Sequence, residues 1–432
     1  MKRPFTTTVI AAALAAALPG TADAVRIDYS LDAGYERDDN VALSATDPIE
    51  QDILRLGAGF ALTHDTSTVQ ASLAGRVDHR RYEDIYDDAT DRMLEGRLNW
   101  MIVPDRFGFV LEDRYGVQTI NRFAPASPDN RQQVNVLSLG PNFYFNAGGA
   151  LRGQAELRYI DSHAEVTQDF NSSRVAGALR IIKDLDATSS LSFNLQGQDI
   201  DFDNDLFARD HKRYEAFATY RRQFNRFDMQ LDGGWSRLDY ADGQSRNNPL
   251  ARAEIGWQPS ERSRFNLNAA NQFSDAATSA LDQIGATTGI PASVMTGDST
   301  VTASAYEVRE LGGGYEYTGV RTSLSLSAYH QRLDYIDVGT ANEEARGGSI
   351  GFGYRLQPTL TLRASASANR TEYNAPANRR EDNRLYSLGL EKQWSRHWSS
   401  TLSATRYSRS SSLDSAEFEQ NLIYIGVTYR NR

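Results

Sequence analysis

Arginine and carboxylate side chains alternate with apolar residues along most of this sequence, so it carries the residue types needed to bind polar molecules. Arginine dominates, because only four of the 46 basic residues are lysines, at positions 2, 183, 212 and 392. Residues 151–159 (LRGQAELRY) show the spacing, with charged or amide side chains at even positions. The planar guanidinium group presents several donors at once, so such a surface can bind carboxylates and sugar hydroxyls.

In a β-strand successive side chains point to opposite faces, so these charged residues share one face of each strand. On the lipid side of a membrane barrel each would cost about 2–4 kcal/mol at the midplane. We therefore predict that they face the interior, where they hold the wall together through ion pairs or contact a passing solute. These two interpretations are compatible. The predicted pore-lining residues are Arg55, Arg76, Arg97, Arg114, Arg152, Glu156, Arg158, Arg180, Arg222, Arg252, Glu254, Arg309 and Arg363.

No catalytic or metal-binding motif accompanies these residues. The six histidines lie at no metal-ligand spacing, and no nucleophile elbow or phosphate-binding glycine loop occurs. Asp78 with His79, and Asp161 with His163, are the only candidates for a catalytic set, and solvated rim residues are the simpler interpretation. Residues 201–205 (DFDND) resemble the start of a calcium loop but lack its glycine and distal glutamate. We expect no enzyme activity, no metal and no cofactor.

The elements that must position these side chains are strands of one domain. Residues 1–24 are set apart first, because a basic start, a short apolar run and the small residues Ala22 and Ala24 predict a cleavable signal peptide. Residues 25–432 contain no linker and are predicted to form one outer-membrane β-barrel. The chain has no cysteine, so its stability must come from the closed sheet rather than from disulfides.

Alternation over twenty segments predicts an all-β fold, a transmembrane antiparallel up-and-down β-barrel of about 20 strands. The alternative is 18, if the first segment and the glycine-interrupted 303–317 do not form separate strands. Short and long connections alternate, which predicts short periplasmic turns and longer extracellular loops. The predicted strands are 25–38, 51–63, 68–82, 92–103, 107–120, 133–146, 150–162, 171–183, 190–202, 212–224, 227–240, 249–258, 264–274, 303–317, 320–336, 345–356, 359–373, 382–394, 397–409 and 419–430.

Composition and aromatic placement agree with a membrane barrel. The mean hydropathy of −0.53 is compatible, because only alternate residues must face lipid. A formal net charge of −10 argues against nucleic acid as a partner. Aromatic residues gather beside the short connections, as in the girdles at membrane surfaces. They are Trp100, Phe107, Phe143, Phe145, Phe224, Phe227, Trp257, Phe265, Tyr315, Tyr317, Trp394 and Trp398.

The C-terminal segment 422–430 (LIYIGVTYR) resembles the signal that the barrel-insertion machinery recognises in outer-membrane proteins, although the last residue is Arg432 rather than an aromatic. With the signal peptide, the Tyr- and Arg-rich strands such as 214–220, and the Pro-marked short turns, the chain resembles the outer-membrane β-barrel porin family called type 2 β-barrel porins. The resemblance implies export of an exopolysaccharide, with periplasmic polysaccharide-export components as partners. Outer-membrane lipid and lipopolysaccharide are further expected partners.

Three functions remain open from the sequence. The first is a pore that exports a surface or secreted polysaccharide, and the alternative is a general or substrate-selective diffusion porin for small solutes. A barrel enzyme or adhesin is disfavoured. The longest loop, 274–302, either folds into the pore as a constriction or gate or stays on the surface, and residues 276–284 have the composition for one or two helical turns.

Overall fold

The computed structural model describes residues 25–431 except 84–85, 122, 125–126, 149, 205–208, 285–288, 295, 298–301 and 338. The predicted signal peptide, 1–24, lies outside the described residues. Within them, 20 long antiparallel strands form a closed barrel, in which the first strand pairs with the last. The predicted antiparallel barrel of about 20 strands is therefore confirmed, and the alternative of 18 is wrong.

The strands lie close to the predicted segments, because the alternating pattern covers nearly the whole of each strand. They are β1 (Val25–Asp38), β2 (Gln51–Asp65), β3 (Val69–Tyr82), β4 (Ala89–Val103), β5 (Phe107–Thr119), β6 (Arg131–Gly148), β7 (Leu151–Ala164), β8 (Ser172–Asp184), β9 (Ser189–Phe202), β10 (His211–Phe224), β11 (Phe227–Tyr240), β12 (Ser245–Ser260), β13 (Ser263–Ser274), β15 (Tyr306–Thr318), β16 (Thr322–Tyr335), β17 (Glu343–Gln357), β18 (Leu360–Tyr373), β19 (Arg379–Gln393), β20 (Trp398–Ser411) and β21 (Phe418–Arg430). A two-residue strand β14 (Thr296–Gly297), a helix α2 (Ala276–Asp282) and the short 3-10 turns η2 (Pro128–Asn130), η3 (Gln168–Phe170) and η4 (Asp414–Ala416) complete the described elements.

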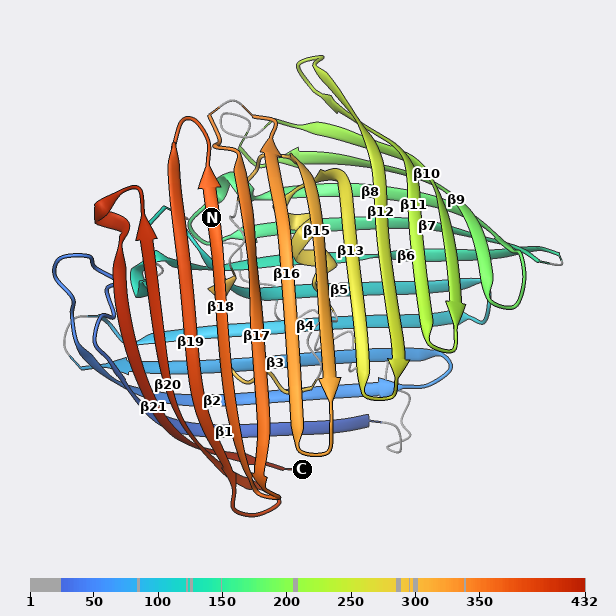
Figure 1. The fold of residues 1–432 in the computed structure, drawn as a ribbon. Coiled ribbons are helices and arrows are strands. Elements are labelled where there is room, and N and C mark those ends of the chain that lie inside the picture. The colour runs from blue at the N-terminus through green and yellow to red at the C-terminus, as the bar shows by residue number, and fades with distance from the viewer. Residues whose placement is uncertain are drawn as a thin grey trace.

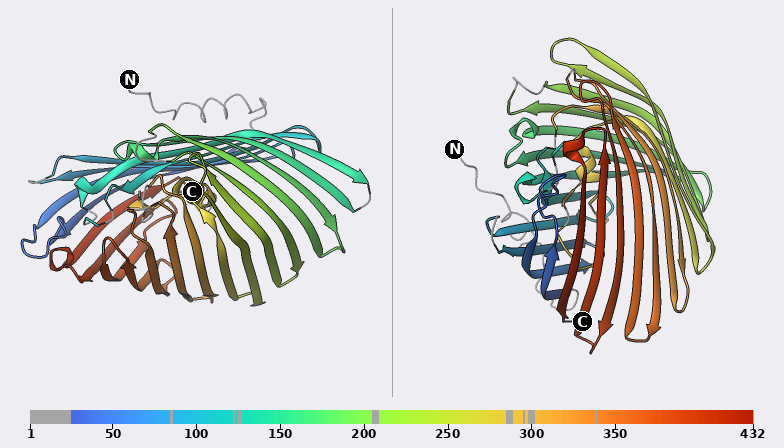
Figure 2. Two further views of the ribbon diagram at one scale, coloured as in Figure 1. Left: turned by 90° about the horizontal axis from the view of Figure 1, so that it is seen from above. Right: turned by 60° about the vertical axis from the view of Figure 1, so that its left-hand side comes forward.

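The barrel has two ends and two walls. Short turns join the strands at one end, called here the short-turn end, and longer connections join them at the other, the long-loop end. In Figure 1 the blue and cyan strands of the far wall run across the orange and red strands of the near wall, and Figure 2 shows the two walls from further directions. The wall closes where blue β1 lies beside red β21.

The two faces of the sheet differ in polarity, as the alternation requires. Residues directly opposite each other in neighbouring strands share a face, so each face can be followed through the register around the barrel. On the outer face, Leu388 is 55% exposed and Ile425 is 56% exposed. Large apolar side chains are exposed on most of the strands and together form a wide apolar surface, which is unfavourable in water and is covered by lipid in a membrane.

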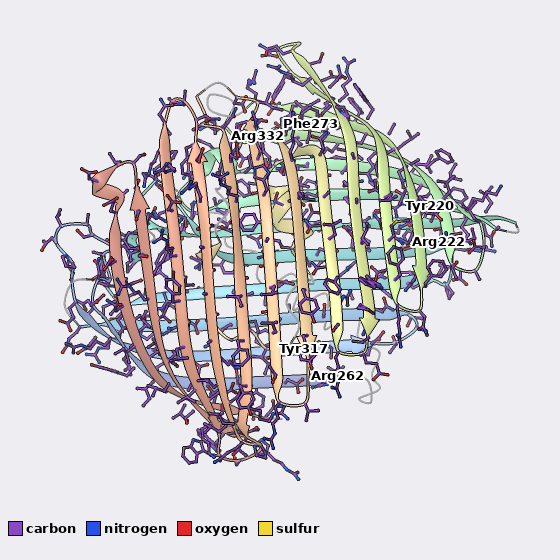
Figure 3. All side chains as sticks on the ribbon, viewed as in Figure 1. Tyr220, Arg222, Arg262, Phe273, Tyr317 and Arg332 are labelled. Atoms are coloured by element: carbon purple, nitrogen blue, oxygen red, sulfur yellow. The ribbon has the colours of Figure 1, made fainter. Side chains whose placement is uncertain are left out.

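Aromatic side chains ring the outer face at the short-turn end. Trp257 and Phe265 stack with ring centroids 5.4 Å apart, and Phe265 contacts Tyr315 at 4.6 Å. Figure 3 places Tyr317 at this end of the near wall and Arg332 at the opposite end. The predicted girdle is therefore present at the predicted level. Among the described residues, no helix has the length and apolarity of a membrane-spanning helix.

Candidate functional site: the lumen and its inner segment

Most of the predicted pore-lining residues lie on the inner face of the barrel, and their contribution to transport stays a prediction. For example, Asp32 of β1 lies opposite Gly57 of β2, and Gly57 opposite Asp78 of β3, so the three share the inner face. The same register places the following predicted residues on that face: Arg55, Arg76, Arg97, Arg114, Arg152, Glu156, Arg158, Arg180, Arg252, Glu254 and Arg363.

Two predicted residues, Arg222 and Arg309, face outward instead. Arg222 shares its face of β10 with Tyr220 and Phe224, and its guanidinium carbon lies 4.4 Å from the centre of the Phe224 ring. Arg309 lies opposite Arg332 on the outer face of the sheet and pairs with Glu307 of its own strand. Both arginines lie near strand ends, where the outer face reaches polar surroundings and charge no longer reports the inward direction.

The inward arginines are ion-paired with carboxylates of the same wall. Arg55 contacts Glu36 at 2.6 Å, and Arg252 contacts Asp232 at 2.7 Å. Arg363, which is 65% exposed, contacts Glu391 at 2.9 Å. The wall is therefore laced by ion pairs, as the first interpretation of these arginines requires, while exposed members such as Arg363 still present donors to the lumen.

The connection between β13 and β15, residues 275–305, is called here the inner segment, and its described residues, 275–284, 289–294, 296–297 and 302–305, fold into the barrel. Its helix α2 leaves β13 and packs on the opposite side of the lumen against β6 and β7. Ala276 and Ala277 are buried there against Val136, Ile160 and Phe170. Figure 1 shows α2, in yellow, behind the near wall. Of the two alternatives for this loop, the inward position is the one observed, and the predicted helical turns at 276–284 correspond to α2.

Asp275 anchors the start of the inner segment. Its carboxylate caps α2 by accepting hydrogen bonds from the amides of Ala277 and Thr278, and it contacts Arg174 of β8 at 2.7 Å. Both partners of this ion pair are 3% exposed. Burial alone would raise the pKa of Asp275, but the guanidinium groups of Arg174 and Arg213 hold that pKa well below its usual range. The carboxylate is therefore charged at every physiological pH.

A second anchor holds the middle of the inner segment. Arg76 contacts Asp32 and Asp78 at 2.7 Å each, and it donates a hydrogen bond to the carbonyl oxygen of Pro291 at 3.2 Å. Asp78 also accepts a hydrogen bond from the amide of Val294 at 2.7 Å. Further along, β14 pairs in parallel with β5. The described residues of the inner segment are therefore attached to β3, to β5 and to β6–β8, on the far side of the lumen from β13.

Contacts between loops also cross the long-loop end. Arg379 of β19 donates a hydrogen bond at 2.8 Å to the carbonyl oxygen of Phe123, which belongs to the connection between β5 and β6. The Phe123 ring lies 5.1 Å from that of Tyr373. Arg209 reaches from the β9–β10 connection to Asp337 of the β16–β17 connection. These contacts and the inner segment together narrow the half of the lumen at the long-loop end.

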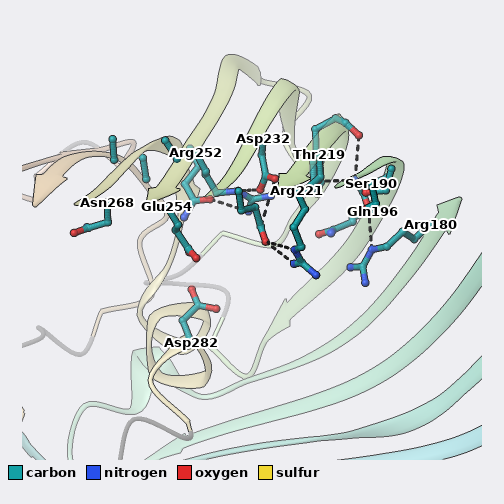
Figure 4. Close-up of a pocket in the computed structure, with 18 of the residues that line it drawn as sticks. Arg180, Ser190, Gln196, Thr219, Arg221, Asp232, Arg252, Glu254, Asn268 and Asp282 are labelled. Carbon is teal, nitrogen blue, oxygen red and sulfur yellow. Dashed lines mark hydrogen bonds and ion pairs between the residues drawn. The ribbon is translucent and has the colours of Figure 1, made fainter. Parts of the chain in front are cut away.

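A cavity of about 660 Å³ lies in the lumen beside α2. Most of its lining residues belong to the halves of β7 to β13 nearest the short turns, and Asp282 of α2 and Glu310 of β15 complete it (Figure 4). Arg152, Arg180 and Arg221 lie on one side, on β7 to β10, while Glu254 and Glu310 lie on the other. The residues labelled in Figure 4 are Arg180, Ser190, Gln196, Thr219, Arg221, Asp232, Arg252, Glu254, Asn268 and Asp282.

A smaller cavity of about 160 Å³ continues this polar surface toward the long-loop end. It shares Arg180 and Gln196 with the larger cavity and adds Arg158 and Arg213. Arg213 in turn lies 3.9 Å from Asp275. The two cavities therefore form one polar track along β7 to β10 that ends at the anchor of α2.

The structure places the two Asp–His candidates of the sequence differently on the sheet. Asp78 and His79 are neighbours on β3 and so point to opposite faces. Asp161 and His163 share the outer face of β7. In the described part of the chain, no three His, Asp or Glu side chains lie close enough to hold a metal ion. Asp205, the last residue of the segment 201–205 that resembles a calcium loop, lies outside the described residues.

Sequence reasoning missed the residues that attach the inner segment to the wall. The signal for α2 was present, because Asp275 directly precedes an alanine-rich stretch, as helix N-caps do. No local signal pointed to its partner, since Arg174 is 101 positions away along the chain. Arg221, Gln230 and Asp232 also line the cavity. The aromatic residues that alternate with them along the strand would have predicted that these side chains point inward. Nothing in the sequence indicated that they lie near Asp282.

No protein-family model matches the sequence, and no curated protein matches it either. Solved structures with a similar course of the chain include the FrpB iron transporter (F3-3 variant) from Neisseria meningitidis, with 10% identity over 94% of this chain and 81% of that chain and a TM-score of 0.47. OpdK of Pseudomonas aeruginosa, solved with vanillate, has 8% identity over 94% and 99% and a TM-score of 0.40. A loop deletion mutant of OmpT from Vibrio cholerae has 15% identity over 94% and 100% and a TM-score of 0.34.

These likenesses concern the course of the chain alone, and the assignment of the fold rests on the strand register. A closed antiparallel barrel of even strand number, apolar outside and polar inside, is the architecture of outer-membrane proteins of Gram-negative bacteria. The chain is an outer-membrane β-barrel. The short-turn end is accordingly the periplasmic end, and the long-loop end faces the cell exterior. The resemblance to the type 2 β-barrel porins stays a prediction.

Proposed function

We propose that the protein is an outer-membrane pore for a polar, hydroxyl-rich substrate, and more specifically for export of a polysaccharide. The observation that carries this proposal is the polar track along β7 to β10, formed by the two cavities that share Arg180 and Gln196. Guanidinium, amide and hydroxyl groups are the partners that sugar hydroxyls and carboxylates need. An extended chain would meet the same kind of group along the whole track, whereas a compact solute needs only one site.

The inner segment supports a gate in this pore. It lies between the track and the long-loop end and is attached to the far wall at a few defined contacts, so a substrate that arrives from the periplasmic side meets it before leaving. The same narrowing favours a second candidate function, a substrate-selective diffusion porin for small solutes. Barrels of 16 to 18 strands already enclose an aqueous channel, so a 20-strand barrel has room for either function once the segment moves.

Planar-bilayer recording of the full chain and of a variant with residues 276–304 replaced by a short glycine-serine linker tests the proposal. We expect a small or intermittent current from the full chain and a large steady current from the variant, because the variant exposes the whole lumen. Neutral oligosaccharides of increasing length, added on the periplasmic side, should then reduce the current in both forms. Block only by the shortest sugars would favour the small-solute porin. A variant that folds but carries no current would contradict any pore.

A further inference from the structure

The outer face of β15 to β18 carries four arginines close together near the long-loop end, and we call them the outer arginine cluster: Arg309, Arg332, Arg346 and Arg370. Arg309 lies directly opposite Arg332, and Arg346 lies directly opposite Arg370. Arg332 lies opposite Glu344, two residues from Arg346, so the two pairs are diagonal neighbours. Like charges placed directly opposite each other in a sheet repel, so this arrangement requires anions nearby.

Each arginine of the cluster has a carboxylate partner on the same face. Arg309 contacts Glu307 at 2.6 Å, and Arg332 contacts Asp334 at 2.9 Å. Arg370 contacts Asp382 at 2.6 Å, while Arg346 reaches Glu372 only at 3.8 Å. The side chains of the four arginines remain between 38% and 56% exposed. Exposed ion pairs contribute little to stability, so these guanidinium groups can exchange their partners at little cost.

The cluster lies at the depth where the apolar band ends. On the same face, toward the periplasm, follow Leu311, Leu326 and Ile350, which are 54%, 40% and 45% exposed. Charged side chains are costly at the midplane of a bilayer and cost little near its surface, so the cluster belongs at the level of the lipid headgroups. Figure 3 shows Arg332 at this upper edge of the near wall.

We propose that the outer arginine cluster binds the phosphate groups of the glycolipid of the outer leaflet, lipopolysaccharide. Guanidinium groups bind phosphate through two parallel hydrogen bonds, and several arginines at a membrane surface add their attractions to anionic headgroups. The four side chains point away from the lumen, so this site is independent of what the pore conducts. It would fix the rotation and depth of the near wall in the outer leaflet.

The test uses the full chain, purified in detergent, with bisphosphorylated lipid A as the probe and native mass spectrometry and thermal unfolding as readouts. The wild type should retain the lipid and unfold at a higher temperature in its presence. The variant R309Q/R332Q/R346Q/R370Q should bind it at least about tenfold more weakly, since each arginine contributes to attraction at the surface. A matched control, R222Q/R226Q/R262Q/R321Q, removes four arginines near the short-turn end and should bind as the wild type does.

Two further probes identify the ligand. Dephosphorylated lipid A should bind the wild type weakly, and inorganic phosphate alone should give no comparable stabilisation. Equal binding of both lipids, equal binding by the cluster variant, or full competition by inorganic phosphate at the lipid's concentration would overturn the proposal. Should the fourfold variant fail to fold, the double variant R346Q/R370Q answers the same question, because it removes one directly opposed pair and leaves the other.

Discussion

Replacing Asp275 with alanine should release the start of the inner segment and raise the single-channel conductance toward that of the variant that lacks residues 276–304. The substitution removes the cap of α2, which is worth about 1 kcal/mol. It also leaves Arg174 buried without its partner at 2.7 Å, and breaking a buried ion pair in this way costs about 3–5 kcal/mol. Helix α2 then loses both the N-cap and the ion pair that hold it against β6 to β8.

The matched control for this prediction is Asp282→Asn, at the other end of the same helix. Burial raises the pKa of Asp282, so this carboxyl group is already easier to neutralise, and its replacement removes the same charge without breaking the Asp275 anchor. Asp282 lines the cavity, so this variant can change the ion selectivity, but its conductance should rise far less than that of the Asp275→Ala variant. Equal conductance of the wild type and the Asp275→Ala variant, with both folded, would mean that the ion pair does not hold the segment in place.

The Asp275 anchor also predicts how the current depends on pH. The pKa of Asp275 is lowered in the folded protein. Its ion pair therefore stabilises the inward position of the inner segment fully at any pH above the ordinary carboxyl pKa of about 3.9. This stabilisation is lost only as the pH falls from the ordinary carboxyl pKa toward the lowered pKa of Asp275. Between pH 8 and pH 5 the wild-type conductance should therefore show no step from this group.

Replacing Arg76 with methionine should lower the stability of the whole barrel by about 3–5 kcal/mol, the usual cost of leaving buried charges without a partner. Arg76 is 4% exposed and holds two carboxylates, Asp32 and Asp78, at 2.7 Å each. Without it these carboxylates, which lie on either side of Gly57 of β2, lose the guanidinium group that contacts both. Denaturant unfolding followed by tryptophan fluorescence in detergent measures the loss.

Two variants decide whether the loss comes from the unpaired carboxylates. Arg363→Met removes an inward arginine whose side chain is 65% exposed and ion-paired with Glu391. This substitution should lower the free energy of unfolding by no more than about 1 kcal/mol. The triple variant D32N/R76M/D78N removes the two charges as well and should recover part of the stability. If the triple variant is less stable than R76M, electrostatic compensation is not what Arg76 provides.

The strands were predictable from the sequence because one physical constraint acts along their whole length. Each residue of a membrane strand faces either lipid or the lumen, so the alternation that the sequence shows is the alternation that the fold uses. The predicted segment 227–240 and strand β11 coincide, and 212–224 differs from β10 by one residue. The number of strands followed from the same count, even for 303–317, where three consecutive glycines weaken the pattern.

The direction of single arginines near strand ends was less predictable. Arg222 and Arg309 were assigned to the lumen because they are charged, but their parity matches that of Phe224 and Leu311, which face outward. Charge identifies the lumen only at the depth of the hydrocarbon, since both faces meet polar surroundings at the ends. Strand parity is the better guide there.

The inner segment was only half predictable. Its length indicated a functional loop, and the composition of residues 276–284 indicated one or two helical turns. Its inward position depends on Arg174, Arg76 and Asp78, which lie on β8 and β3 and carry no sequence signal that links them to the segment. Long-range pairings of this kind arise from the closed barrel itself, which brings distant strands to face each other.

The central claim is a cylinder that is wet inside and surrounded by lipid outside, and thiol labelling tests it most directly because the chain has no cysteine of its own. Single cysteines are placed at successive positions of β18 in reconstituted protein and treated with a water-soluble thiol reagent. Ser365 and Ser367 lie on the inner face, and Ala364 and Ala366 lie on the outer face. Cysteines at 365 and 367 should react rapidly and those at 364 and 366 hardly at all. Equal labelling at all four positions, or labelling at 364 and 366 alone, would contradict the claim.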